Sequence, residues 1–152
     1  MNRPMLFNPK RNGVAVIVER KDGCVLACQR LNCRDMNGLW QFPGGAIEVN
    51  ESAMAAASRE LYEETGVAAP PRLTFLCAGV GLTPDHEIFV TQFFIARPVV
   101  DPLDFAVKNT EPDKHSDWEW VNPEELRHRN VIPLIPLALS EFKIWKKWES
   151  GK

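Results

Sequence analysis

Three glutamates near the middle of the chain, Glu60, Glu63 and Glu64, have the type and spacing to act together. They stand at i, i+3 and i+4 of a stretch rich in alanine, so a helix at about 100° per residue would place them on one face. Carboxylates at this spacing repel one another, and the negative end of the helix dipole adds to the cost. A hard divalent cation would offset the repulsion. The alternative is a solvated acidic face on which Arg59 pairs with Glu63.

These glutamates belong to a longer pattern, which we call the signature box, between Gly45 and Val67. It reads Gly-x5-Glu-x7-Arg-Glu-Leu-x-Glu-Glu-x-Gly-Val, and the chain meets it at every fixed position. The pattern resembles the signature of the Nudix hydrolases, which cleave nucleoside diphosphates linked to another group. The resemblance implies a Nudix fold of the α/β (α+β) class, in which a mixed β-sheet is sandwiched between helices.

The resemblance also implies roles for the residues of the box. Water would attack a phosphate of a nucleotide with the help of Mg²⁺, or of Mn²⁺ as an alternative. Glu63 and Glu64 would bind the metal, and Glu60 would be either a further ligand or the base that activates water. The carbonyl of Gly44 would complete part of the coordination shell. Arg59 would orient a glutamate through a charge-assisted hydrogen bond.

Two residues outside the acidic face are expected beside the substrate. The backbone at Gly45 would face a phosphate, and Arg30 stands where relatives carry an arginine that contacts phosphate. A solvated arginine at the end of a strand is the alternative for Arg30. Ala46 departs from the family, whose members often carry a basic or polar residue after the Gly-Gly pair. One expected contact to phosphate or base is therefore missing.

A second region, Glu111 to Val121, bears on the substrate class. It contains Glu111-Pro112-Asp113-Lys114 and Trp118-Glu119-Trp120-Val121, and it resembles the MutT-like branch of the family. In that branch a glutamate outside the box often reaches the metal, and Glu111 is the candidate for this ligand and catalytic role. The branch converts a nucleoside triphosphate, normal or oxidised, to the monophosphate and pyrophosphate. An exposed turn before an amphipathic strand is the alternative.

Two other functions stay open from the sequence. Pro84 lies close to where ADP-ribose-cleaving relatives carry a proline, which favours ADP-ribose, a nucleotide sugar or a dinucleoside polyphosphate as substrate. A module that binds a nucleotide without turnover is the other alternative. Such modules tend to lose the catalytic glutamates, whereas this chain keeps all of them.

Composition predicts one domain over residues 1–152, in an ordinary globular protein with 45% hydrophobic and 25% charged residues. The net charge of −2 argues against a nucleic acid polymer as partner and favours a small-molecule nucleotide. No stretch is apolar enough to span a membrane. The four cysteines lack a CxxC spacing, which predicts reduced thiols and a cytoplasmic protein. A monomer and a homodimer are both open.

Periodicity and turn residues predict alternating strands and helices. Lys21-Asp22-Gly23 indicates a hairpin between the first two strands. Ser52 is expected to cap the helix of the box, and Gly66 to end it in a left-handed conformation. Three histidines, at 86, 115 and 128, have no metal-ligand spacing and are predicted to be structural or at the surface. The expected strands cover 14–19, 24–29, 39–42, 73–80, 87–96 and 118–121, and the other helical segments cover 123–126 and 135–148.

Overall fold

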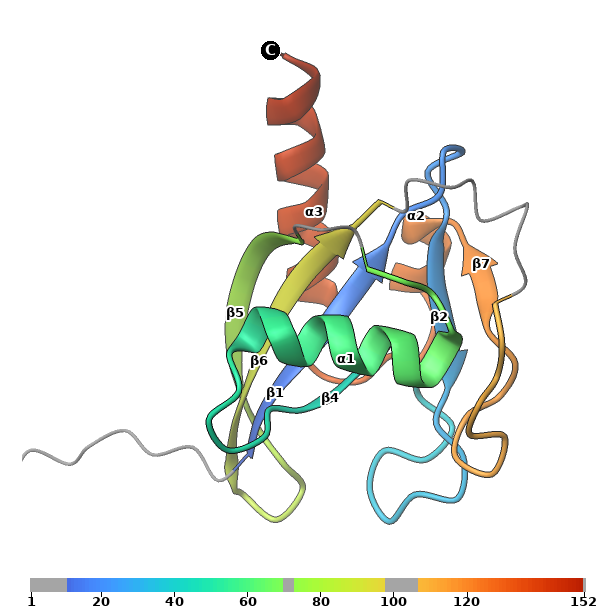
Figure 1. The fold of residues 1–152 in the computed structure, drawn as a ribbon, viewed down its shortest axis with the longest axis vertical. Coiled ribbons are helices and arrows are strands. Elements are labelled where there is room, and N and C mark those ends of the chain that lie inside the picture. Colours follow the sequence, from blue (N-terminus) through green and yellow to red (C-terminus); the bar gives the residue numbers. More distant parts are fainter. Residues whose placement is uncertain (1–10, 70–72, 98–106, 152) are drawn as a thin grey trace, which may run out of the picture.

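Two β-sheets form the centre of the fold in the computed structural model, which describes residues 11–69, 73–97 and 107–151 (Figure 1). The larger sheet has the strand order β4-β1-β6-β5, in which β1 and β6 are parallel and the other neighbours antiparallel. The smaller sheet has the order β3-β2-β7. The strands are β1 Arg11–Val18, β2 Val25–Gln29, β3 Trp40–Gln41, β4 Gly44–Ala46, β5 Thr74–Leu82, β6 Ile88–Ala96 and β7 Glu119–Val121.

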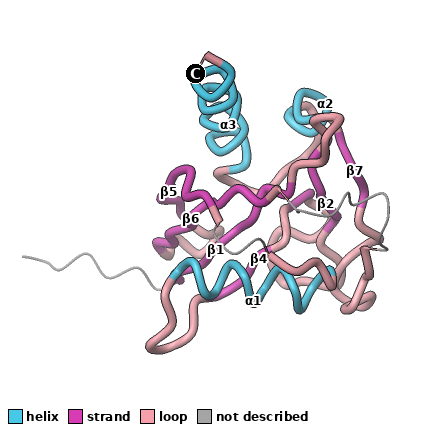
Figure 2. The backbone as a smooth tube through the Cα atoms, turned by 45° about the horizontal axis from the view of Figure 1, so that its top comes forward, coloured by secondary structure: helices cyan, strands magenta, loops and turns pink. Residues whose placement is uncertain are grey.

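Helices cover both faces of the larger sheet, as predicted. Helix α1, Ala53–Thr65, lies on one face and helix α3, Ile135–Ser150, on the other, while α2, Pro123–Arg127, is a short segment between them in sequence (Figure 2). Strand β1 is buried on both faces because its side chains alternate. Val14 and Val16 pack in the core beneath α1, whereas Ile17 packs in the core beneath α3. None of the helices in the described part of the chain is long and apolar enough to cross a membrane.

The predicted hairpin at 21–23 is correct for the turn and wrong for the strands. Arg20 N–H donates to the Cys24 carbonyl at 2.9 Å and Gly23 N–H to the Arg20 carbonyl at 2.9 Å. Beyond one bridge between Glu19 and Val25, however, β1 and β2 separate into different sheets. They separate because β4 and β6 already take both edges of β1, so β2 pairs with β3 and β7 instead.

The segment after Pro43, which lies outside all of the strands expected from the sequence, is the short strand β4. Gly44 lies so close to β1 that a Cβ on it would stand 2.2 Å from the carbonyl oxygen of Val14. A glycine is therefore required where this edge strand pairs with β1. The pairing fixes the backbone of Gly44 and Gly45 next to the helix that carries the glutamates.

The ends of α1 follow the prediction. The Ser52 hydroxyl accepts a hydrogen bond from the Ala55 amide at 3.1 Å, which satisfies one of the free donors of the first turn. Gly66 has φ +74° and donates its amide to the Tyr62 carbonyl. Asn122 caps α2 in the same way, through the Glu124 amide. These caps fix where the acidic helix starts and stops.

Replacing Gly66 by alanine tests the left-handed end of α1. A Cβ at this position would meet only the Lys108 side chain, at 3.9 Å, so the cost comes from the backbone conformation. We expect Gly66→Ala to lower the free energy of unfolding by about 1–2 kcal/mol in a urea titration. Gly151→Ala is the matched control because Gly151 ends α3 with φ −83°. An equal loss in both variants would contradict the assignment.

Candidate active site

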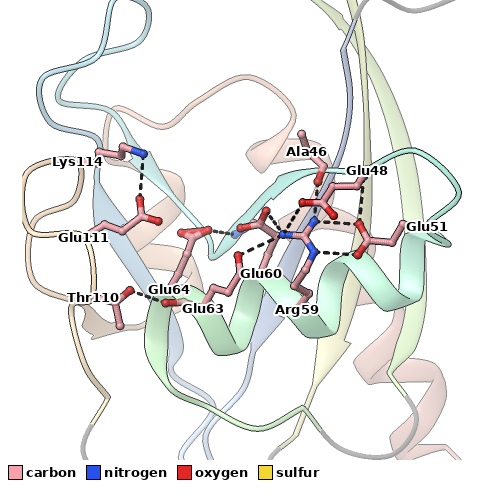
Figure 3. Close-up of polar contacts among 11 residues, drawn as sticks. Ala46, Glu48, Glu51, Arg59, Glu60, Glu63, Glu64, Thr110, Glu111 and Lys114 are labelled. Atoms are coloured by element: carbon pink, nitrogen blue, oxygen red, sulfur yellow. Dashed lines mark hydrogen bonds and ion pairs between the residues drawn. The ribbon is translucent and has the colours of Figure 1, made fainter.

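The most buried carboxylate of the signature box is Glu64, in the last turn of α1 (Figure 3). Its side chain belongs to a residue only 3% exposed, and its Oε1 accepts the Gly44 amide at 3.1 Å. Its Oε2 accepts no hydrogen bond from any residue that the structure describes. Burial, reinforced by the nearby charges of Glu60 and Glu111, raises the pKa of Glu64 to about 9. The buried Glu64 carboxyl therefore has fewer hydrogen-bond partners among the described residues than buried polar groups usually have.

Glu60 lies one turn earlier and points at β4. A Cβ on Gly45 would stand 2.5 Å from the carboxyl carbon of Glu60, so only glycine lets the carboxylate come this close to the strand. Burial raises the pKa of Glu60, and the hydrogen bond from Arg59 opposes that shift. Glu63, on the same face, is about half exposed and is the most accessible of the three acids.

Arg59 binds the acidic helix to the loop before it. Its guanidinium donates two hydrogen bonds to the Glu51 carboxylate, at 2.8 and 2.9 Å, and one to the Ala46 carbonyl at 3.0 Å. It also reaches Glu60 Oε1 at 2.9 Å and Glu63 Oε2 at 3.2 Å. The bidentate contact lowers the pKa of Glu51 to about 2, and Glu51 in turn raises the pKa of Arg59. The guanidinium thus binds protein groups on the helix, in the loop and on β4; its orienting role stays a prediction.

The backbone of Gly44 is turned toward the glutamates. Val16 N–H donates to the Pro43 carbonyl, and Ile47 N–H to the Asn12 carbonyl, so backbone groups in this antiparallel pair alternate in direction. The Gly44 amide points away from β1, because it donates to Glu64. Since the N–H and C=O of one strand residue point the same way, the Gly44 carbonyl also faces the α1 side. It is therefore available to a ligand shared with Glu64.

The chain from Lys108 to Trp118 closes the C-terminal end of α1. Lys108 N–H donates to the Thr65 carbonyl at 2.9 Å, and Thr110 Oγ1 to the Glu63 carbonyl at 2.5 Å. Trp118 Nε1 donates to the Glu64 carbonyl at 3.2 Å. These bonds satisfy carbonyls that a helix end leaves without partners. They also carry the next acid, Glu111, to the glutamate face.

Glu111 stands beside the box although it lies far from it in sequence (Figure 3). Its charge contributes to the raised pKa values of both Glu60 and Glu64, so it is close enough to repel them. Its one ion pair among the described residues is with Lys114, at 3.4 Å. The sequence prediction that a fourth carboxylate approaches the box is consistent with this placement.

His115 is the residue of the site that sequence reasoning missed. The prediction that it is structural or at the surface does not place it beside the glutamates. It is only 8% exposed, and its Nε2 lies 3.6 Å from Glu64 Oε2. Burial lowers the pKa of His115, so the pair does not depend on a charged imidazole. The histidine reaches the site because residue 115 bridges to Arg30 across the sheet. In the sequence, only its position four residues after Glu111 could have indicated that His115 lies near the site.

Arg30 lines a cavity of about 540 Å³ on the far side of β4 from the glutamates. Its Nη1 donates to Gln41 Oε1 at 3.1 Å and its Nη2 to the Asp35 carbonyl at 3.4 Å, while its buried Nε has no partner among the described residues. The arginine is therefore held at the cavity wall and is not a freely solvated strand end. The cavity also borders Gly44, Gly45 and Ala46 of β4. This single short strand separates the cavity from the glutamates.

The acidic cluster suits a hard cation in chemistry, although its side chains are not yet arranged around one. Within residues 11–69, 73–97 and 107–151, no three ligating side chains already converge on a common point. Arg59 holds one oxygen each of Glu60 and Glu63, and Gly44 holds one oxygen of Glu64. The second oxygen of Glu64 is buried and accepts no hydrogen bond from any described residue. Oxygen ligands of this kind fit Mg²⁺.

Comparison with known proteins agrees with this geometry. The NUDIX domain family matches residues 9–139. The chain is 50% identical over 126 residues to a CTP pyrophosphohydrolase of Escherichia coli (strain K12), covering 82% of this chain and 85% of that protein. It is 30% identical over 140 residues to an RNA pyrophosphohydrolase of Erythrobacter litoralis (strain HTCC2594), covering 81% and 82%. The chain therefore belongs to the Nudix family, and it is a Nudix hydrolase.

A solved structure gives the same answer for the fold. The crystal structure of a MutT NUDIX hydrolase from Burkholderia pseudomallei superposes with a TM-score of 0.75 at 26% identity, covering 86% of this chain and 96% of that one. The predicted resemblance to the MutT-like branch is thereby confirmed.

The buried Glu64 should make the metal-free protein less stable as the pH rises. The unfolded chain releases this proton near pH 4.3, whereas the folded chain releases it at about 9. The folded state therefore holds more protons in that window, and its stability falls with rising pH. Glu64→Gln cannot titrate, so its advantage over wild type should grow by at least about 1 kcal/mol between pH 5 and pH 8.

Urea titrations in EDTA at pH 5 and pH 8 measure this difference. Glu48→Gln, at an exposed position of the same loop, controls for the loss of one carboxylate. A Glu64→Gln protein that is no more stable than wild type at pH 8 would mean that this carboxyl carries no burial penalty.

Proposed function

We propose that this chain is a Mg²⁺-dependent pyrophosphohydrolase that converts a nucleoside triphosphate to the monophosphate and pyrophosphate. The observation that carries the proposal is a buried Glu64 oxygen that no described residue hydrogen-bonds, which stands among Glu60, Glu63 and Glu111 beside a cavity of about 540 Å³. Four carboxylates together repel one another unless a cation neutralises them. The cavity lies just across β4 from them, where the nucleoside of a bound triphosphate would be held.

The metal would be held by Glu63, Glu64 and the Gly44 carbonyl, with Glu111 as a further ligand; Mn²⁺ is the alternative ion. When bound, the metal supplies positive charge that cancels the charge of the phosphates and of the leaving group. Arg59 holds Oε1 of Glu60, so Glu60 Oε2 would be the oxygen that accepts the proton of the attacking water. Arg59 and Glu51 keep these carboxylates in place.

The phosphate chain would run over β4, from the cavity to the glutamates. Gly45 lines the cavity along this path, and Arg30 supplies positive charge from the cavity wall. Ala46 lines the same path and offers no charge to the phosphates.

A cytidine triphosphate is the substrate that the comparisons favour. The CTP pyrophosphohydrolase of E. coli shares half of the aligned residues with this chain. A second candidate is the triphosphate at the 5′ end of an RNA, because relatives at about 30% identity carry that name. A net charge of −2 gives the chain no general attraction for a polymer, so the free nucleotide is preferred.

A substrate panel with Mg²⁺ tests the proposal. It contains CTP, the other nucleoside triphosphates, ADP-ribose, a dinucleoside polyphosphate and an RNA with a 5′ triphosphate, with products separated by chromatography. Monophosphate and pyrophosphate from a nucleoside triphosphate are the expected products. AMP from ADP-ribose alone, or pyrophosphate from RNA alone, would replace the proposed substrate. Silence across the panel would favour a nucleotide-binding module without turnover.

Glu63→Gln should remove most turnover while the fold stays intact. The amide keeps the size of the side chain but loses the charge that binds the cation, so we expect kcat/KM to fall at least about 100-fold. Mg²⁺ should also raise the melting temperature of this variant less than that of wild type. Glu48→Gln is the control at the exposed edge of the same acidic region and should keep its activity. Near-normal activity of Glu63→Gln would contradict the assignment of Glu63 as a metal ligand.

A further inference from the structure

The floor of the cavity is one face of the paired strands β1 and β6. These strands are parallel and in register, with Arg11 opposite Phe89, Gly13 opposite Thr91 and Ala15 opposite Phe93. Because side chains alternate along a strand, these residues lie on the same face, opposite to α1. The small residues Gly13 and Ala15 leave room in the middle of this floor. The cavity exists because two of the β1 positions that face it carry almost no side chain.

An ion pair closes the end of the cavity at the start of β1. Arg11 Nη2 lies 3.7 Å from Asp35 Oδ2, and both residues line the cavity. Asp35 is held in place through its backbone, whose carbonyl accepts Arg30 Nη2. Its side chain is 19% exposed, and its carboxylate accepts no hydrogen bond from the residues that the structure describes. The pair therefore presents an acceptor and a donor side by side, neither of them fully used.

Most of the remaining wall is apolar. Phe42, Phe89, Phe93 and Ile135 surround the space with aromatic and aliphatic carbon. An apolar slot with a few placed polar groups is the usual form of a site for a flat heterocycle. The aromatic carbon would contact the faces of such a ring, which leaves its edge to the polar pair.

Arg11 lies toward the end of β1 that is remote from the glutamates. Ala15 is opposite Gly44 in the neighbouring strand, next to the glutamates, and Arg11 is four residues before it in β1. Four residues of strand span about 13 Å. A nucleoside whose phosphates reach Gly44 would therefore place its base edge near Arg11 and Asp35.

We propose that Arg11 and Asp35 read the base of the substrate. Asp35 accepts a hydrogen bond from an exocyclic amino group, and Arg11 donates to the neighbouring ring nitrogen. Cytosine presents this donor beside an acceptor, and so does adenine. Uracil presents a carbonyl where the amino group would be, and that oxygen would face the Asp35 carboxylate without a proton between them. The proposal rests on the proposed function and adds to it a preference for cytosine over uracil.

Steady-state kinetics of the full chain with CTP and UTP tests the pair. Wild type is expected to prefer CTP by about tenfold or more in kcat/KM, the usual worth of one good base contact. Asp35→Asn should lower the ratio of CTP to UTP by about tenfold, because an amide can donate to the uracil carbonyl. The change should appear in KM, with kcat for CTP nearly unchanged, since Asp35 does not touch the phosphates. Arg11→Gln is the second variant and should lower the ratio in the same direction.

Arg34→Gln is the matched control. Arg34 belongs to the same loop as Asp35 and forms an ion pair with Asp85 at 3.9 Å, yet neither residue of that pair lines the cavity. Its CTP to UTP ratio should equal that of wild type. A wild-type preference for UTP, or an unchanged ratio in folded Asp35→Asn and Arg11→Gln, would overturn the base-reading pair while leaving the hydrolase intact. A wild type that hydrolyses no nucleoside triphosphate would overturn both proposals.

Discussion

The guanidinium of Arg59 is the contact on which the candidate site depends. It binds Glu51 in the loop, Glu60 and Glu63 on the helix and the carbonyl of Ala46 on β4. Without it, the carboxylates of α1 would repel one another and the loop before the helix would lose its anchor. The planar fork of arginine suits this task because a lysine ammonium cannot bind a carboxylate in a bidentate manner. Arg59 thus pre-positions the carboxylates that are proposed to bind the metal.

The same cluster carries a cost in the absence of that second cation. Glu64 is buried with an oxygen that no described residue satisfies, and its pKa is about 9. A fold selected only for stability would carry a glutamine or an apolar residue there. A bound metal would explain the acid, because metal binding would offset the free energy that the burial of the carboxylate costs. Groups with a strongly shifted pKa, such as the Glu64 carboxyl, are typical of functional sites.

Strand β4 lies between the glutamates of α1 and the cavity. Its glycines allow two close approaches, of β1 to Gly44 and of the Glu60 carboxylate to Gly45. The cavity with Arg11 and Asp35 lies beyond it, on the face of the larger sheet that α3 covers. Under the proposed function, a nucleotide that spans β4 would have its phosphates hydrolysed on one side and its base read on the other. Different elements would then determine the reaction class and the base preference.

The sequence by itself determined the helix of the box, its caps at Ser52 and Gly66, and the shared face of its glutamates, because these depend on neighbours within one or two turns. It also indicated the family, through a pattern confined to Gly45–Val67. The pairing of β1 and β2 was misjudged, since a turn signal does not say whether the edges of a strand are already occupied. Only tertiary structure placed His115 beside Glu64, and only the register of β1 with β6 placed Arg11 at the end of a cavity opposite Asp35. Those contacts join residues far apart in the chain, and the packing of two sheets, which no local pattern records, decides them.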